Sequence, residues 1–181
     1  ELETEQLVAG QAKFVSGRNL IVPANAQALA PYSAGTRGQQ PIVLSASEKI
    51  TFEGNLDWGD KPENAARLVV MSAGDASFAQ GMSLGSATSD LVLSSRRDIL
   101  MDGVKLEVSQ EAIIRGMRDV SLNNVQVGAD AVATIKANRN LNVDGLTFSR
   151  GVSSILMEAT TVRLSNVNFP INSAVRLNSL K

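Results

Sequence analysis

The chain of 181 residues is 44% hydrophobic and 4% aromatic, and its 17 basic and 18 acidic side chains give a formal net charge of −1. These values support one well-buried domain, and they provide no basic excess to neutralise phosphates, so nucleic acid is not an expected partner. The sequence has neither cysteine nor histidine, which excludes disulfides, thiolate metal sites and the commonest general base and metal ligand.

The N-terminal part ends in residues 17–22, Gly-Arg-Asn-Leu-Ile-Val, a layout that returns further along the chain. We expect residues 1–22 to form the N-terminal cap and the first rung of a stack of repeats. The end of such a stack exposes a free strand edge, and that edge needs a cover.

Residues 23–90 are predicted to form irregular coils. The loose copies of the layout are residues 49–54 and residues 75–78, the second followed by Met82 and Leu84. After the first copy, Leu56 and Trp58 are expected to lie inside the coil, in place of Leu146 and Phe148 of a later one. Two insertions interrupt these coils and are predicted to be loops: residues 23–38 and residues 57–67.

Residues 91–181 repeat every 21 residues, and regular coils are expected throughout this range. Five columns at this spacing are apolar at every occurrence, which chance does not readily produce. The columns are Leu93, Ile114, Ile135, Leu156 and Leu177; Ile99, Val120, Leu141 and Val162; Met101, Leu122, Val143 and Leu164; Val104, Val125, Leu146 and Val167; and Leu106, Val127, Phe148 and Phe169.

The pattern within each repeat predicts short strands rather than a helix. Apolar and polar residues alternate, as in residues 120–122 and 141–143, and this places the apolar side chains on one face of a strand. The strands are separated by residue types that accept tight bends. These corners are Asp102-Gly103, Asn123-Asn124, Asp144-Gly145 and Ser165-Asn166.

Three short strands per repeat predict one all-β domain over residues 1–181, a right-handed parallel β-helix whose stacked coils bury a continuous core. The leucine-rich repeat has a similar period but needs an asparagine at a fixed position and a helical stripe. The four corresponding positions hold Ser109, Asp130, Gly151 and Asn172, and no helical stripe is present. The parallel β-helix is therefore the preferred prediction.

The repeated pattern, seen at residues 139–148 as Arg-Asn-Leu-Asn-Val-Asp-Gly-Leu-Thr-Phe, resembles that of the pectin-lyase-like β-helices. It is most similar to filamentous-haemagglutinin-type and autotransporter-type surface proteins of Gram-negative bacteria. The resemblance covers about residues 40–181 and implies secretion, with adhesion or scaffold duty in a longer rod-like protein. It transfers no site residues, because the catalytic motifs of the lyases and hydrolases of this fold have no counterpart here.

Two polar columns run beside each other at the start of the second strand of each repeat. They consist of Arg97, Arg118 and Arg139, and of Asp98, Asp119 and Asn140. One interpretation is a pair of carboxylates one coil apart, as in a retaining glycosidase, with arginine to bind anionic sugars. The other is a solvated corner in which arginine and aspartate screen each other.

Other polar residues also carry two interpretations. One interpretation of the next corner is a calcium site, and the other is a ladder of side chains that bond the turn backbone. The residues at this corner are Asp102, Asn123, Asp144 and Ser165. The acidic loop is interpreted either as a site for a cation or a partner, or as a solvated loop, and its residues are Asp57, Asp60 and Glu63.

One apolar column is expected on the outside of the coils, next to the inward residues of the first strand. Its members are Val92, Ile113, Thr134 and Ile155. Such a stripe indicates either a protein contact or ordinary exposed aliphatic residues.

We therefore predict a non-enzymatic structural or adhesive segment of a larger secreted or bacterial cell-surface protein, with no catalytic, cofactor-binding or metal-binding residue assigned. The alternative is a carbohydrate-binding or polysaccharide-degrading β-helix with its site on the loops at residues 23–38 and 57–67. The expected partners are a protein or glycan at the cell surface and neighbouring coils of the parent chain, without nucleic acid or membrane insertion. The strand at residues 175–177 is expected to pair with residues 154–156, and its other edge to be open or covered by another element.

Overall fold

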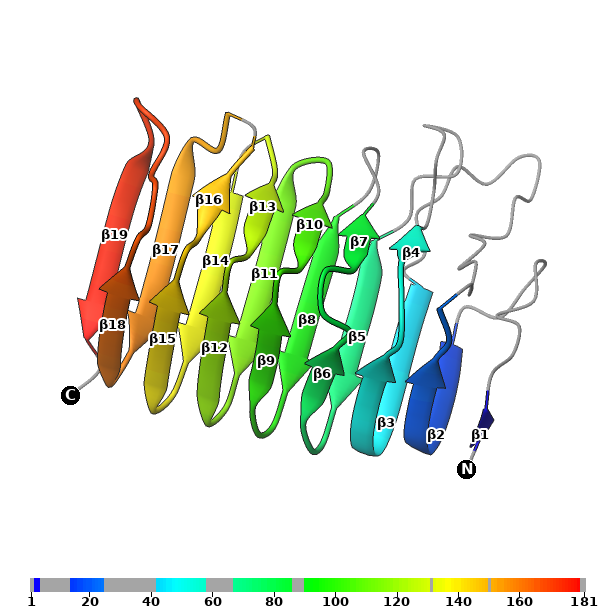
Figure 1. The fold of residues 1–181 in the computed structure, drawn as a ribbon. Helices are drawn as coiled ribbons and strands as arrows, with labels where there is room; N and C mark the ends of the chain where they lie inside the picture. Colours follow the sequence, from blue (N-terminus) through cyan, green and yellow to red (C-terminus); the bar gives the residue numbers. More distant parts are fainter. Residues whose placement is uncertain are drawn as a thin grey trace.

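The computed structural model describes residues 2–3, 14–24, 42–57, 67–85, 90–130, 132–149 and 151–179. Every regular element in these ranges is a β-strand, and every pairing between the strands is parallel (Figure 1). The described residues contain no helix that could span a membrane. The strands are β1 (Leu2–Glu3), β2 (Phe14–Val22), β3 (Ile42–Phe52), β4 (Leu56–Asp57), β5 (Leu68–Ser72), β6 (Ala76–Phe78), β7 (Ser83–Gly85), β8 (Leu91–Ser95), β9 (Ile99–Asp102), β10 (Lys105–Glu107), β11 (Glu111–Gly116), β12 (Asp119–Asn123), β13 (Gln126–Gly128), β14 (Val132–Ala137), β15 (Asn140–Asp144), β16 (Thr147–Phe148), β17 (Ser154–Ala159), β18 (Thr161–Ser165) and β19 (Ala174–Ser179).

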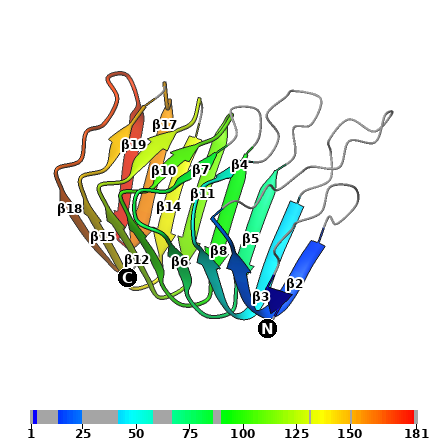
Figure 2. The ribbon, with the colours of Figure 1, turned by 45° about the vertical axis from the view of Figure 1, so that its right-hand side comes forward.

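The strands wind into a right-handed coil with three faces (Figures 1 and 2). We call the series β5, β8, β11, β14, β17 and β19 the back sheet, and the series β6, β9, β12, β15 and β18 the front sheet. The series β4, β7, β10, β13 and β16 is the small sheet. Strand β3 is long enough to bend around a corner, so it pairs with β5 in the back sheet and with β6 in the front sheet.

The predicted β-solenoid with coils of about 21 residues is confirmed between residues 68 and 179, where it makes about 5 turns. In the central turns each strand pairs with the equivalent strand one coil on, so that Val120 pairs with Ile99 on one side and with Leu141 on the other. Upstream the strands are also in register but the steps are longer, since Ile42 pairs with Leu68 and Leu68 pairs with Leu91. The 21-residue step begins at Leu91, which pairs with Ala112.

The irregular first half contains one misaligned prediction. Leu56 pairs in register with Leu84 of the small sheet, and Leu84 pairs with Leu106. Leu56 therefore fills the column that was expected to hold Trp58, and the expected match of Leu56 to Leu146 is wrong. Trp58 itself lies outside the described residues. The copy at residues 75–78 continues into the small sheet as the pattern predicts, and both Met82 and Leu84 are buried.

The core is built from the inward side chains of all three faces. Leu141, Leu106 and Leu93 each have 0% of their surface exposed, and Phe148 packs against this core while remaining partly exposed. Two ring pairs continue the stacking, with centroids 4.8 Å apart for Phe52 and Phe78 and 6.2 Å apart for Phe148 and Phe169. Fully burying one such side chain contributes about 1.5–3 kcal/mol, so these columns are the main stabilising element.

The register of β17 differs from the prediction. Ile135 pairs with Met157, 22 residues on, and Met157 pairs with Leu177, 20 residues on. Met157 is buried, and Leu156 faces outward with intermediate exposure. The inward column therefore contains Met157 in place of Leu156, and β19 aligns residues 175–177 with residues 155–157 instead of 154–156.

The predicted corners between the front and small sheets are confirmed. The second residue of each corner has a positive φ: 64° at Gly103, 49° at Asn124, 73° at Gly145 and 51° at Asn166. Glycine and asparagine are the residues that enter this left-handed region at the lowest cost. The Asp-Gly, Asn-Asn and Ser-Asn pairs of the sequence thus fix where each coil turns.

Replacing Gly145 by alanine should therefore lower the free energy of unfolding by at least about 1–2 kcal/mol, the cost of a left-handed alanine. The added Cβ would also lie 2.5 Å from Oδ1 of Asn124, closer than atoms pack. Gly151→Ala is the control, because nothing lies within 4 Å of a Cβ at that position and its φ is not in the left-handed region. Urea titrations of the two variants compare them, and equal midpoints would contradict the corner assignment.

Candidate functional site

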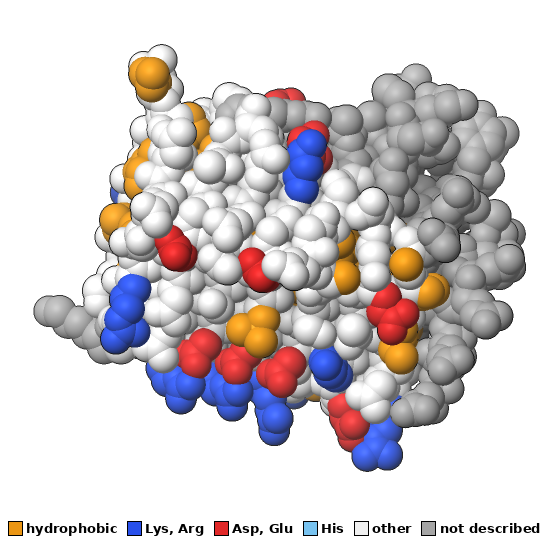
Figure 3. Space-filling view, viewed as in Figure 1, with side chains coloured by type: hydrophobic (Ala, Val, Ile, Leu, Met, Phe, Trp, Pro, Cys, Tyr) orange, Lys and Arg blue, Asp and Glu red, His pale blue; other side chains and the backbone are white. Residues whose placement is uncertain are grey.

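The arginine and aspartate columns lie at the bend between the back and front sheets, along the lower edge of the molecule in Figure 3. Arg118 pairs with Asp98 of the preceding coil, with Nε donating to Oδ1 at 2.7 Å and Nη2 donating to Oδ2. Arg139 pairs with Asp119 in the same two-pronged way, with Nε to Oδ1 at 2.9 Å. The sequence prediction that these residues stack is correct.

Backbone amides complete each carboxylate's contacts. The amide of Asp119 donates to Oδ1 of Asp98 at 3.1 Å, and the amide of Asn140 donates to Oδ1 of Asp119 at 3.1 Å. Upstream, the amide of Asp98 donates to Oδ1 of Asp75 at 3.2 Å. Asp98 and Asp119 thus each join their own coil to the next through an arginine side chain and a peptide group, and Nδ2 of Asn140 adds a further bond to Oδ1 of Asp119 at 2.9 Å.

These contacts set the chemistry of the two carboxylates. The hydrogen bonds from Arg139, together with those from Asn140, lower the pKa of Asp119 from its ordinary value of 3.8 to about 2. The hydrogen bonds from Arg118 lower the pKa of Asp98 in the same way. A glycosidase needs one carboxylic acid with a raised pKa, so the shift is opposite to the one that acid catalysis requires.

The lowered pKa values predict how stability depends on pH. Because the folded-state pKa lies below the unfolded one, the stabilisation is present above about pH 4 and is lost as the pH falls toward 2. We expect the melting temperature of Asp119→Asn to be lower than that of the wild type at pH 7, and to fall less between pH 5 and pH 2. Glu53→Gln, which removes an exposed carboxylate elsewhere, is the control. If the melting temperatures of Asp119→Asn and of the wild type fell by the same amount between pH 5 and pH 2, the assignment would be contradicted.

At the next corner, amide side chains bond carboxylates of the preceding coil in two places, once within the second polar column and once from Asn166 beside it. Nδ2 of Asn123 donates to Oδ1 of Asp102 at 2.8 Å, and Nδ2 of Asn166 donates to Oδ1 of Asp144 at 2.8 Å. These bonds run from coil to coil rather than to the turn backbone, which refines the ladder interpretation. Among the described residues, no group of three or more acidic side chains is placed to hold a metal ion.

The acidic loop prediction concerns Asp57, Asp60 and Glu63. Asp57 is the last residue of β4. Asp60 and Glu63 lie outside the described residues, as does most of each loop at residues 23–38 and 57–67.

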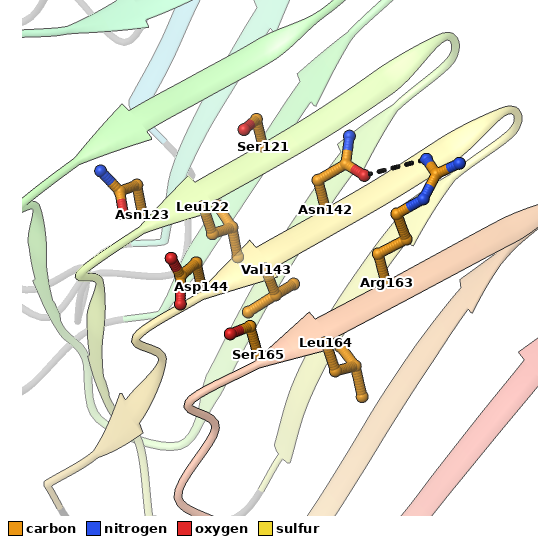
Figure 4. A pocket seen from close by; sticks show the side chains of 9 residues that line it. All are labelled: Ser121, Leu122, Asn123, Asn142, Val143, Asp144, Arg163, Leu164 and Ser165. Atoms are coloured by element: carbon orange, nitrogen blue, oxygen red, sulfur yellow. Dashed lines mark hydrogen bonds between the residues drawn. The ribbon is translucent and has the colours of Figure 1, made fainter.

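A shallow groove that the sequence did not indicate lies over β12, β15 and β18 of the front sheet (Figure 4). Its volume is about 460 Å³, and it spans three coils. Two rows of polar side chains border it, while the strands of Leu122, Val143 and Leu164 form its floor. The polar rows are Ser121, Asn142 and Arg163, and Asn123, Asp144 and Ser165.

The groove presents donors and acceptors that are only partly used. Nη1 of Arg163 donates to Oδ1 of Asn142 at 3.4 Å, so these two side chains lie together on one side of the groove (Figure 4). No side-chain partner among the described residues is present for the amide nitrogen of Asn142 or for the other nitrogens of the guanidinium. Arg118 and Arg139, in contrast, are held by carboxylates. No aromatic side chain is among the residues that the structure places around the groove. The groove can therefore hydrogen-bond a polar ligand but offers no stacking surface.

Comparisons with protein-family models, with curated proteins and with solved structures find no match for this chain. The parallel β-solenoid is established by the structure alone, and the resemblance to particular families rests on the coil pattern.

Proposed function

We propose that the chain is a non-enzymatic structural or adhesive β-helix segment of a larger secreted or cell-surface protein, of the haemagglutinin or autotransporter type within the pectin-lyase-like group. The observation that supports this most directly is the corner ladder. Asp98 and Asp119 are each bound by an arginine and a peptide amide of the next coil, so they serve to join coils and not to transfer protons.

A stack held together in this way gives a stiff rod with a large, uniform surface, as a spacer or an adhesive surface needs. The front sheet supports this use, because its exposed surface is mostly polar and carries few charged side chains (Figure 3). Neutral polar side chains bind hydroxylated surfaces without the long-range charge that attracts unrelated partners.

Two measurements test the proposal together. Beads coated with the chain should adhere to surfaces carrying glycoproteins or polysaccharides, whereas beads coated with heat-denatured chain should not. The soluble chain should release no reducing ends from the same polysaccharides above a buffer control. Release that disappears in Asp144→Asn would overturn the non-enzymatic assignment. An antibody against the chain should label intact cells or the culture medium of the source organism, and exclusively intracellular labelling would contradict the location.

The groove favours a second candidate, carbohydrate binding without hydrolysis. Its volume of about 460 Å³ falls in the range of small-ligand sites. Amide, hydroxyl and carboxylate groups bind sugar hydroxyls, and the forked guanidinium of Arg163 matches a sugar carboxylate. This places the candidate site on the front sheet, and the earlier hypothesis of a site on the two loops concerns residues that lie mostly outside the described ranges.

Titration calorimetry with oligosaccharides, with and without carboxylate groups, tests this candidate. Arg163→Ala should weaken binding of the acidic sugars about tenfold or more, since a charge-assisted hydrogen bond contributes about 1.5–3 kcal/mol. Arg115→Ala, which removes an exposed arginine from the back sheet, is the matched control and should leave the affinity unchanged. Equal effects of the two variants would exclude the groove as the site.

A further inference from the structure

The outward face of the back sheet carries an apolar stripe that is aliphatic at every position but one, where a threonine stands. Equivalent outward residues in six successive strands are paired in register and have intermediate exposure, and we call this column the back stripe. It consists of Val43, Val69, Val92, Ile113, Thr134 and Leu156. The expected outer column is thus extended at its N-terminal end, and Leu156 replaces Ile155, which is buried. With strands about 4.8 Å apart, the stripe is about 24 Å long.

The front sheet provides an internal comparison. Its equivalent outward column passes through the same coils and is polar except at one position. The column is Thr51, Ser77, Leu100, Ser121, Asn142 and Arg163. The preference of strands for β-branched residues applies to both sheets, so it does not explain why aliphatic residues gather on the back sheet alone. An apolar stripe bordered by charges is instead typical of an interaction surface.

Among the described residues, the net charge beside the stripe differs in sign between its two sides. On one side Arg67 lies 3.6 Å from Asp90 and 3.2 Å from Glu111, which leaves one acid in excess. On the other side Lys136 pairs with Glu158 at 3.3 Å, and Arg115 adds one base in excess. The two sides of the stripe are therefore complementary to each other.

This pattern identifies the partner that fits the surface. Glu111 and Arg115 lie two residues before and two residues after Ile113 on β11, so all three side chains share the outward face. A rotation of 180° about an axis along the stripe exchanges its two sides. It would place Glu111 of each copy opposite Arg115 of the other while the aliphatic side chains pack together. We propose that the back sheet is the interface of a symmetric dimer in which two copies of this chain pack face to face along the back stripe.

Such a dimer meets the requirement of a two-fold interface, in which one surface must be complementary to itself. Sheets packed face to face with nearly aligned strands are a common arrangement. The stripe is only one residue wide, so the dissociation constant should be on the order of micromolar or weaker.

Sedimentation equilibrium of the 181-residue chain, from about 1 µM to about 1 mM, is the first test. The wild type should pass from monomer to dimer in this range, and Ile113→Lys should remain monomeric. Leu100→Lys is the matched control, because Leu100 is an exposed aliphatic residue of the front sheet with 53% of its surface accessible. It should dimerise like the wild type. Circular dichroism and melting temperature confirm that each variant is folded.

Two charge reversals then test the arrangement. Glu111→Arg and Arg115→Glu should each weaken dimerisation about tenfold or more, because each places like charges opposite each other twice. An equimolar mixture of the two variants should regain wild-type affinity, since every contact in the mixed dimer joins opposite charges. A monomeric wild type at all concentrations would overturn the proposal, as would association that survives Ile113→Lys. A mixture no tighter than the single variants would exclude the two-fold arrangement.

Discussion

Replacing Leu141 by aspartate is expected to cost several kcal/mol and to unfold the chain or lower its melting temperature sharply. Leu141 has 0% of its surface exposed and lies between Val120 and Val162 of the neighbouring coils. A carboxylate at this position would be surrounded by apolar side chains, without a partner for its charge. Because every coil supports the next, damage in β15 also weakens β12 and β18.

Thr147→Asp provides the comparison for this prediction, since Thr147 lies on the exposed side of β16. Its effect should be within about 0.5 kcal/mol, as for most surface substitutions. Thermal denaturation followed by circular dichroism measures both variants. Similar melting temperatures would mean that the inward and outward sides of the coil are assigned the wrong way round.

The second large effect is expected at Met157. Met157→Asp should destabilise the chain by several kcal/mol, because Met157 is fully buried between Ile135 and Leu177. Leu156→Asp should have a much smaller effect, because this neighbouring side chain faces outward. The two substitutions introduce the same group at adjacent positions, so their comparison shows directly which of the two residues faces the core.

Urea titration of the two variants at neutral pH provides the measurement. If Leu156→Asp proves to be the more harmful, β17 has the uniform 21-residue spacing. The pairing of Ile135 with Met157 would then be incorrect.

Most of the fold was predictable because the coil is a short-range pattern. The alternation within residues 120–122 and the left-handed corners at Asn124 and Gly145 are local properties of the sequence. The phase of β17 was not predictable, because Ile155, Leu156 and Met157 are three consecutive apolar residues and alternation fits them in either phase. The step from Ile135 to Met157 is one residue longer than 21, and the step from Met157 to Leu177 is one residue shorter. The residues on either side of β17 therefore keep the 21-residue spacing, and the spacing alone does not reveal the shift.

The candidate site was predictable only in part, for a related reason. The ladder of Asp98 and Arg118 follows from spacing, since residues about one coil apart must lie side by side. The groove over β12, β15 and β18 is a property of shape. Ser121, Asn142 and Arg163 differ in type, and their common surface depends on how much each side chain fills the space above its strand.

Because the coils stack in register, the length of the molecule can change in units of one whole coil. The contacts that β12 makes with β15 closely repeat those that β9 makes with β12, since Val120 pairs with Ile99 below and with Leu141 above. A deletion or duplication of one whole coil therefore leaves every remaining strand with a suitable neighbour, whereas a change by a fraction of a coil turns side chains to the wrong face. Evolution can lengthen or shorten such a rod in steps of about 4.8 Å by recombination between coils, without redesigning the core.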